Sequence, residues 1–174
     1  AQNAAQDTES GLRRSLARFD SVVDHHRSAI YSWRRRILSQ GAYLQVVARE
    51  VSHILSREEH SLLSESDLKR LLKWNERSTQ ERAAIVSLLW DSERLAPLAD
   101  LKEKPELRKV ILTLIDRYWQ QYLAEVEWLE DSISVVAVAG EDPYIRFVEE
   151  TDQMFHAMRQ ELSLALLSSI VEAV

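Results

Sequence analysis

Few residues in this 174-residue chain have the types and spacing that support chemistry. Glu50-x-x-His53 has the spacing of one half of a carboxylate-bridged di-metal site, and His156 is a conceivable further ligand. Such a site also needs a second Glu-x-x-His and two more inward glutamates, and the sequence offers no such set. We therefore expect Glu50 and His53 to lie on a solvated helix face and the chain to hold no metal.

Other reactive motifs are missing as well. The sequence contains no cysteine, no Gly-x-x-x-x-Gly-Lys phosphate loop, no Gly-x-Gly-x-x-Gly and no Gly-x-Ser-x-Gly elbow. The chain by itself therefore has no nucleotide site, no predicted catalytic residue and no cofactor. His26 falls on an apolar helix face and is expected to be a hydrogen-bonded core histidine, and Arg34, Arg35 and Arg36 form a basic helix end.

Composition predicts an all-α fold. Only three Gly and three Pro occur, which favours a few long helices over many short strands. In residues 1–38 apolar side chains and His26 alternate in steps of three and four, as along one face of a long helix. They are Leu12, Leu16, Phe19, Val23, His26, Ile30, Trp33 and Ile37. Gly41 follows as a helix end.

Residues 107–174 predict a helical hairpin with its tip at 133–142. Pro105 suits the opening turn of the first hairpin helix, and Asp142 followed by Pro143 suits the N-cap and first residue of the second. The predicted inner faces are Leu107, Ile111, Leu114, Tyr118, Tyr122, Val126, Leu129 and Ile133, then Phe147, Thr151, Met154, Met158, Leu162 and Leu166. At the tip, Val135, Val136 and Val138 beside Gly140 are expected to be exposed, so they either contact another protein or fold back onto the bundle.

The middle segment, residues 39–106, is expected to contain shorter helices. One is predicted from about Ala42 to Leu63 and another, beginning at Ser64 or Ser66, through Trp74. Ser78 and Glu81 form a capping box ahead of a helix over residues 83–90. Residues 91–104 are predicted to be irregular. The tryptophans are expected to anchor the core. These are Trp33, Trp74, Trp90, Trp119 and Trp128.

Charge limits the possible partners. The net charge is −6, which argues against a general nucleic-acid binder. Residues 101–174 alone have a charge of −7, with 14 acidic and 7 basic side chains. No apolar run approaches the ~20 residues that span a bilayer. The chain begins at Ala1 without a methionine, and we expect it to be a piece of a longer polypeptide.

Two blocks of the sequence resemble the C-terminal scaffold of SecA, the ATP-driven motor of bacterial preprotein translocation. The first block, residues 11–38, matches the opening of the family's long scaffold helix, and the second, residues 115–158, matches its two-helix finger. Matching positions that we take as the scaffold motif are Asp20, Arg27, Tyr31, Asp116, Trp119, Asp142 and Pro143. Between the two blocks there is no convincing match.

The resemblance implies a long scaffold helix (residues 1–38), a small helical wing (39–106) and a two-helix finger (107–174). It implies that the fingertip, here Val135, Val136, Val138 and Gly140, contacts the SecYEG channel and the preprotein during export. It further implies partner motor domains that bind ATP and Mg²⁺ outside this chain, and a cytoplasmic location, peripheral at the inner face of the bacterial plasma membrane.

The chain departs from the family pattern at several positions. The Arg and Tyr of the family's fingertip fall on Val136 and Val138, the His of its first finger helix on Tyr122, and the Gln before Arg27 on His26. These departures indicate a divergent or accessory SecA-like protein. Two alternatives stay open: a stand-alone helical adaptor that binds a protein through its acidic hairpin, and a di-metal carboxylate enzyme.

Overall fold

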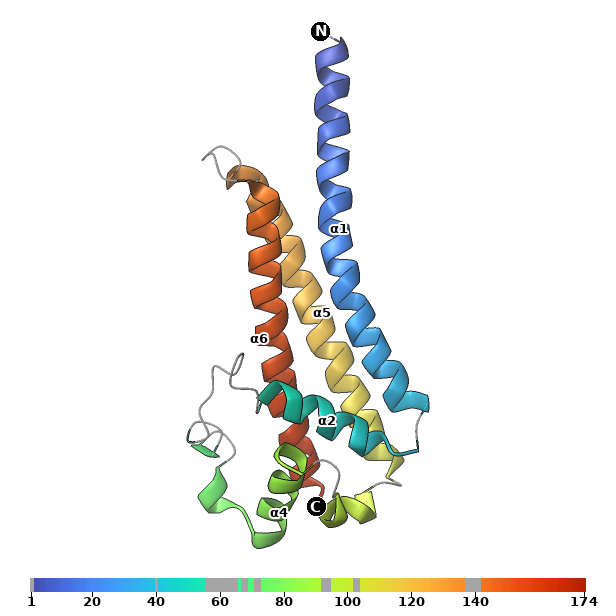
Figure 1. The fold of residues 1–174 in the computed structure, drawn as a ribbon, viewed down its shortest axis with the longest axis vertical. Helices are drawn as coiled ribbons and strands as arrows, with labels where there is room; N and C mark the ends of the chain where they lie inside the picture. Colours follow the sequence, from blue (N-terminus) through green and yellow to red (C-terminus); the bar gives the residue numbers. More distant parts are fainter. Residues whose placement is uncertain are drawn as a thin grey trace. The chain divides into compact units, whose positions relative to one another are not determined.

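A computed structural model describes residues 2–39, 41–55, 66, 69–70, 73–91, 95–101, 104–136 and 142–174 of the chain, with the side chains of 2–16 and 134–136 excepted. Every regular element in these ranges is a helix and none is a strand, which confirms the all-α fold class (Figure 1). The elements are α1 (Gln2–Ser39), α2 (Tyr43–Leu55), η1 (Trp74–Glu76), α4 (Thr79–Leu89), η2 (Ala96–Leu101), α5 (Pro105–Val136) and α6 (Pro143–Glu172).

Helix ends follow the chemistry of their caps. Ser78 accepts a hydrogen bond from the Glu81 amide at 3.2 Å, and Glu81 accepts one from the Ser78 amide at 2.7 Å, so the predicted capping box is confirmed. Helix α5 begins at Pro105, as predicted. Asp142 caps α6 by accepting a hydrogen bond from the Tyr144 amide at 2.9 Å.

The middle of the chain corrects one prediction and leaves another untested. Residues 91–104 contain the 3-10 helix η2, Ala96–Leu101, where an irregular connection was predicted. Leu98 and Leu101 of η2 are buried, and this burial accounts for the ordered turn. The predicted continuation of α2 beyond Leu55, to Leu63, lies outside the described residues.

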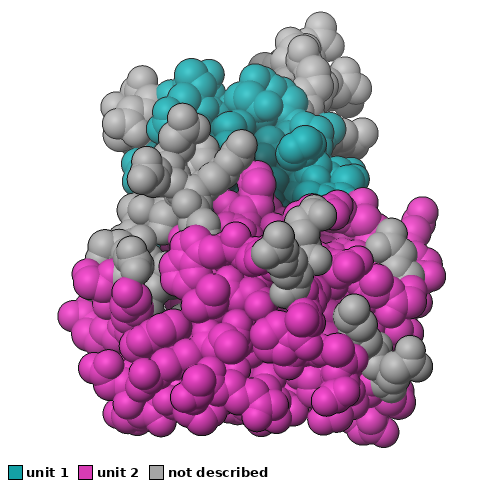
Figure 2. All heavy atoms as spheres, turned by 60° about the horizontal axis from the view of Figure 1, so that its bottom comes forward, with its two compact units in different colours: residues 1–31, 119–157 teal, residues 32–118, 158–174 magenta. Residues whose placement is uncertain are grey.

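The chain divides into two compact units, coloured in Figure 2. Unit 1 comprises residues 1–31 and 119–157, and unit 2 comprises residues 32–118 and 158–174. Helices α1, α5 and α6 each supply a segment to both units. These units are defined by packing, whereas the predicted segments 1–38, 39–106 and 107–174 are continuous stretches of the sequence. The segments stay a prediction.

Unit 2 is organised around α2. Its buried residues Leu44, Val47 and Val51 follow one helical face, and α2 packs against α4, which in turn contacts η2. Tyr43 donates its hydroxyl to the Leu101 carbonyl at 2.8 Å, and Ser52 donates to the Leu89 carbonyl at 2.6 Å. These bonds tie the ends of η2 and α4 to α2.

In unit 1, contacts fix the directions of the three helices. Phe19 of α1 stacks on Phe147 of α6, with ring centroids 4.2 Å apart, and His26 stacks on Phe155 at 4.0 Å, so α1 and α6 run in the same direction. His26 also contacts Tyr122 of α5. Because α5 leads into α6 through a short connection, α5 and α6 form an antiparallel hairpin against α1.

Candidate functional site

The candidate site is the part of the hairpin in unit 1: α5 from Trp119 to Val136 and α6 from Pro143 to Ala157. Helix α5 continues to Val136, three residues beyond Ile133, where the predicted inner face ended. The helical backbone therefore includes Val135 and Val136, and their side chains are not described. Val138 and Gly140, the other predicted fingertip residues, lie outside the described residues.

A polar network centred on the buried His26 joins the three helices of unit 1. His26 is only 4% exposed; its Nδ1 lies 2.7 Å from the Tyr122 hydroxyl, and its Nε2 lies 3.0 Å from Oδ1 of Asp152. A neutral imidazole with its proton on Nε2 satisfies both contacts, accepting from Tyr122 and donating to Asp152. Burial and the negative charge of Asp152 raise the pKa of Tyr122, which keeps its hydroxyl protonated as a donor. The prediction that His26 is a hydrogen-bonded core histidine is confirmed.

Aromatic rings surround this network. Tyr122 packs against Trp119, with centroids 5.3 Å apart, and against Phe155 at 5.5 Å. Together with the ring of His26 on Phe155, these contacts form a continuous aromatic core across the base of the hairpin in unit 1. Such a core holds α5 and α6 at a fixed spacing.

The predicted scaffold-motif residues occupy different environments. Trp119 is buried, and the exposed Tyr31 meets it edge-on at 6.4 Å. Asp20 and Arg27 are exposed on α1, where Arg27 pairs with Asp24 one turn earlier. These contacts lie within unit 1 and do not assign a function to the residues.

In unit 2, Asp116 accepts a bidentate pair of hydrogen bonds from Arg34, at 2.8 and 3.2 Å. This fork is the favoured geometry of an arginine with a carboxylate, and it joins α1 to α5. The basic helix end predicted at Arg34 thus makes a structural ion pair.

Among the described residues of the hairpin in unit 1, two large apolar side chains are exposed. Trp128 of α5 is 72% exposed and Ile145 of α6 is 56% exposed. Trp128 was predicted to anchor the core, and that prediction was wrong, because position 128 lies off the face formed by Tyr122, Val126 and Leu129. The same helical spacing could have identified Trp128 as a surface residue from the sequence.

The prediction that Trp90 anchors the core was also wrong. Trp90 is the C-cap of α4, and 49% of its surface is exposed. The tryptophans that are buried are Trp33 and Trp119, while Trp74 is half-buried.

On the inner face of α5 the structure buries Ile115 and Trp119 where Leu114 and Tyr118 were predicted. Both sets of residues follow a helical face in steps of three and four, so the spacing alone did not identify which set is buried.

The hairpin surface in unit 1 is strongly acidic. Among the described residues from 119 to 157, Arg146 is the one Lys or Arg, and its Nε pairs with Glu150 at 2.6 Å. The acidic residues are Glu125, Glu127, Glu130, Asp131, Asp142, Glu149, Glu150 and Asp152. Burial, together with the neighbouring carboxylates of Asp20, Asp131 and Glu127, raises the pKa of Glu130. The hairpin therefore presents negative charge around the exposed Trp128 and Ile145.

The prediction that Glu50 and His53 lie on a solvated helix face is confirmed for the exposed His53 and was wrong for Glu50, whose side chain is 22% exposed. Glu50 pairs with Arg159 of α6 and lies 4.0 Å from Arg36 of α1, all within unit 2. The Glu50 carboxylate, which a metal would need as a ligand, is therefore already paired with guanidinium groups. Over the described residues, no three His, Cys, Asp or Glu side chains gather where they could hold a metal ion.

The fold and site thus define a helical scaffold that carries a stiff acidic hairpin. The described part of the chain has no helix long and apolar enough to cross a membrane. The SecA Wing and Scaffold domain matches residues 1–173, and this chain belongs to that family.

Named relatives agree with this membership. The chain is 30% identical to the protein translocase subunit SecA of Tropheryma whipplei (strain Twist), over 91% of the chain and 22% of that protein. It is 25% identical to the protein translocase subunit SecA of Aquifex aeolicus, over 98% of the chain and 19% of that protein. The chain thus spans about a fifth of the length of these relatives.

Proposed function

We propose that this chain is the scaffold and two-helix finger of a SecA-type protein translocase. In this role the hairpin of α5 and α6 engages a SecYEG-type channel and the preprotein, while the motor domains of the longer polypeptide bind ATP and Mg²⁺. The family match over residues 1–173 carries the proposal, because it spans the scaffold helix, the middle segment and the hairpin together. The implied location is cytoplasmic, at the inner face of the bacterial plasma membrane.

The mechanics of the hairpin support this role. In unit 1, α5 from Trp119 to Val136 rises by about 27 Å at ~1.5 Å per residue. The aromatic core and the His26 network join this length to α1 and α6. A helix pair supported in this way transmits displacement without catalytic groups of its own.

The surface of the hairpin also suits contact with another protein. Exposed Trp128 and Ile145 supply apolar contact area on a charged background. Aromatic anchors of this kind often dominate binding energy at protein interfaces. We assign channel or preprotein contact to this surface as well as to the predicted fingertip residues Val135, Val136, Val138 and Gly140.

Site-specific photocrosslinking in the full-length protein tests the proposal. A crosslinker at position 138 should capture channel or stalled preprotein only when ATP is supplied. The matched control is Gln80, an exposed residue of α4. Equal capture from positions 138 and 80 would reject the finger role.

A stand-alone adaptor that binds a protein through its acidic hairpin is the second candidate, favoured by the charge and exposed apolar residues of unit 1. The complete reading frame separates the two candidates. A motor with a phosphate loop upstream of Ala1 supports the translocase, whereas a start codon directly before Ala1 supports the adaptor.

A further inference from the structure

Helix α4 of unit 2 has apolar side chains on two opposite faces. The inner face packs against α2 and η2 and is buried. Its residues are Ala84, Ile85, Leu88 and Leu89. The opposite face has a second row of small or apolar side chains, which we call the outer stripe: Thr79, Ala83, Val86 and Trp90. Steps of four, three and four residues, at about 100° per residue, place these positions within an arc of about 60°.

The outer stripe is open to solvent. Val86 is 42% exposed and Trp90 is 49% exposed, while Thr79 is also exposed and Ala83 is half-buried. Trp90 continues the stripe because, as the C-cap, its backbone stays in the right-handed helical region. The solvent face of a surface helix is normally polar. A contiguous row of apolar side chains in that place marks a contact with another protein surface.

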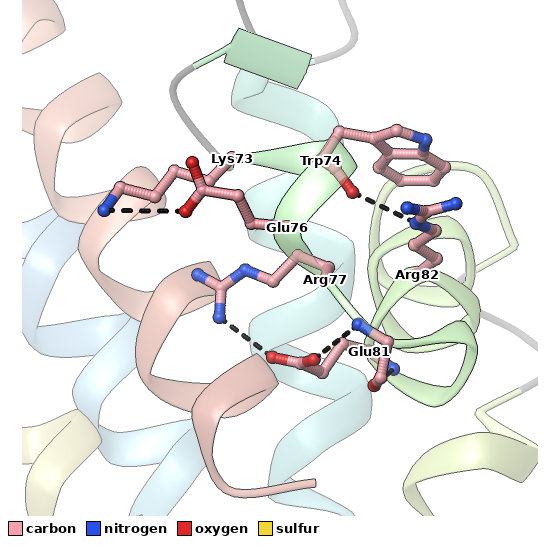
Figure 3. Close-up of polar contacts among 7 residues, drawn as sticks. Lys73, Trp74, Glu76, Arg77, Glu81 and Arg82 are labelled. Carbon is pink, nitrogen blue, oxygen red and sulfur yellow. Dashed lines mark hydrogen bonds and ion pairs between the residues drawn. The ribbon is translucent and has the colours of Figure 1, made fainter.

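The charged side chains of α4 lie outside the outer stripe. There are two, Glu81 and Arg82, and both are engaged within the chain. Glu81 accepts a hydrogen bond from Arg77 at 3.0 Å, and Arg82 donates one to the carbonyl of Trp74 at 3.0 Å (Figure 3). The four side chains of the stripe carry no charge, so the surface that matches them is apolar.

The side chains of the outer stripe are graded in size. Thr79 and Ala83 at the start of α4 are small, whereas Val86 and Trp90 at its end are larger. When two copies of the stripe lie antiparallel about a two-fold axis, Thr79 faces the partner's Trp90 and Ala83 faces the partner's Val86. Each larger side chain then meets a smaller one, which fills the space between two helices without a void or a clash. A parallel pair would instead oppose Trp90 with the partner's Trp90 and leave a gap at the other end.

We propose that α4 is a contact between two copies of this chain, which pair antiparallel through the outer stripe. The contact is isologous, because the same stripe serves both copies about the two-fold axis. From Thr79 to Trp90 the helix rises by about 16.5 Å at ~1.5 Å per residue. A contact of this length buries less than the ~800 Å² per partner of a standard interface, so we expect a dissociation constant on the order of 100 μM. This inference goes beyond the translocase role and does not depend on it.

Sedimentation equilibrium of the 174-residue chain tests the association. Between about 10 μM and about 1 mM the average mass should rise from 20.2 kDa toward twice that value. A mass that stays constant up to about 1 mM would overturn the proposal and assign the stripe to a helix of another protein or of a longer polypeptide. A mass that rises past the dimer without a plateau would also overturn it, since an isologous contact closes at two copies.

A pair of matched valine variants tests the location. Val86 of α4 and Val110 of α5 are similarly exposed, at 42% and 45%, so a glutamate at either position adds the same charge to the surface. Val86→Glu should weaken the association at least about tenfold, because two carboxylates then come together near the two-fold axis. Val110→Glu should change it by less than about twofold, since a distant exposed charge is screened. Equal weakening by the two variants would indicate general charge repulsion and overturn the proposal.

Single cysteines test the orientation, since the chain has none of its own. In the antiparallel pair the two copies of position 83 lie about 4.5 Å apart along the helix axis, and the two copies of position 79 lie about 16.5 Å apart. Under mild oxidation Ala83→Cys should therefore form a disulfide-linked dimer, which needs Cα atoms within about 7 Å, and Thr79→Cys should not. Equal crosslinking of the two variants would indicate a parallel or random contact and overturn the proposal.

Discussion

Replacing Tyr122 with Phe tests whether the polar network of unit 1 stabilises the hairpin. The change removes one hydroxyl and keeps the ring in contact with Trp119 and Phe155. It deletes the 2.7 Å contact with Nδ1 of His26, whose side chain is almost fully buried. The effect therefore reports on one hydrogen bond between buried groups.

The magnitude follows from two contributions. A hydrogen bond contributes about 0.5–1.5 kcal/mol net, and a buried acceptor that loses its partner costs about 1–3 kcal/mol. We expect Tyr122→Phe to lower the free energy of unfolding by about 2 kcal/mol. At this chain length that corresponds to a fall in Tm of ~4–8 °C.

Urea unfolding followed by circular dichroism measures the loss, with Tyr118→Phe as the control. Tyr118 lies on the same helix and is only half-buried, so its hydroxyl should contribute less than about 0.5 kcal/mol. In a double-mutant cycle with His26→Leu, the two changes should couple by about 1 kcal/mol. A loss for Tyr122→Phe no larger than for Tyr118→Phe, or strict additivity in the cycle, would refute the reasoning.

Three further substitutions give expected outcomes that thermal unfolding at several pH values can check. Hydrogen bonds from the backbone and side chain of Ser78 lower the pKa of Glu81 to about 2. The ionised Glu81 carboxylate therefore stabilises the fold fully above pH ~4.5, and this stabilisation is lost as pH falls toward 2. Glu81→Gln should lower Tm at pH 6, and the Tm values of the variant and the parent protein should become equal near pH 2. The pKa of Glu130 is raised, so its charged form destabilises the fold at pH 7. Glu130→Gln should therefore raise the free energy of unfolding by about 0.5 kcal/mol at pH 7, and this gain should vanish below the unfolded-state pKa near 4.5. An unchanged gain at pH 3 would contradict the charge explanation. Glu50→Gln should destabilise by about 1–2 kcal/mol because it removes the charge that faces Arg159, and an unchanged Tm would show that this pair is not stabilising.

Local signals in the sequence were sufficient to place several helix ends. The capping pair Ser78 and Glu81 and the dipeptide Asp142-Pro143 mark the starts of α4 and α6, because a cap satisfies amides within three residues of itself. The seam of α1 was likewise predicted correctly from Phe19 to Ile37. In each case the physical cause lies within one or two turns of the chain.

Burial along α5 was harder to predict. The inner face was assigned to Leu114 and Tyr118, but the structure buries Ile115 and Trp119 instead. Both registers are apolar, so hydrophobic periodicity alone does not choose between them. Contacts with other helices decide the register, as the packing of Trp119 against Tyr122 illustrates.

The candidate site depends on contacts between distant segments. His26 and Tyr122 are 96 residues apart, and His26 and Asp152 are 126 apart. The sequence predicted a hydrogen-bonded His26 but could not identify its partners, since helix periodicity does not state which side chains of neighbouring helices meet. Exposure of Trp128, in contrast, was encoded in its position off the apolar face.

The partners of His26 change the interpretation of two departures from the SecA pattern. Positions 26 and 122, where the family pattern has Gln and His, carry His and Tyr here, and the structure places them in direct hydrogen-bonding contact. In this chain His26 and Tyr122 supply one acceptor and one donor, so the residues that differ from the pattern make a polar link between α1 and α5. Loss of either partner would leave the other buried group without this hydrogen bond. Divergence at these positions is therefore compatible with a hairpin that is joined to α1.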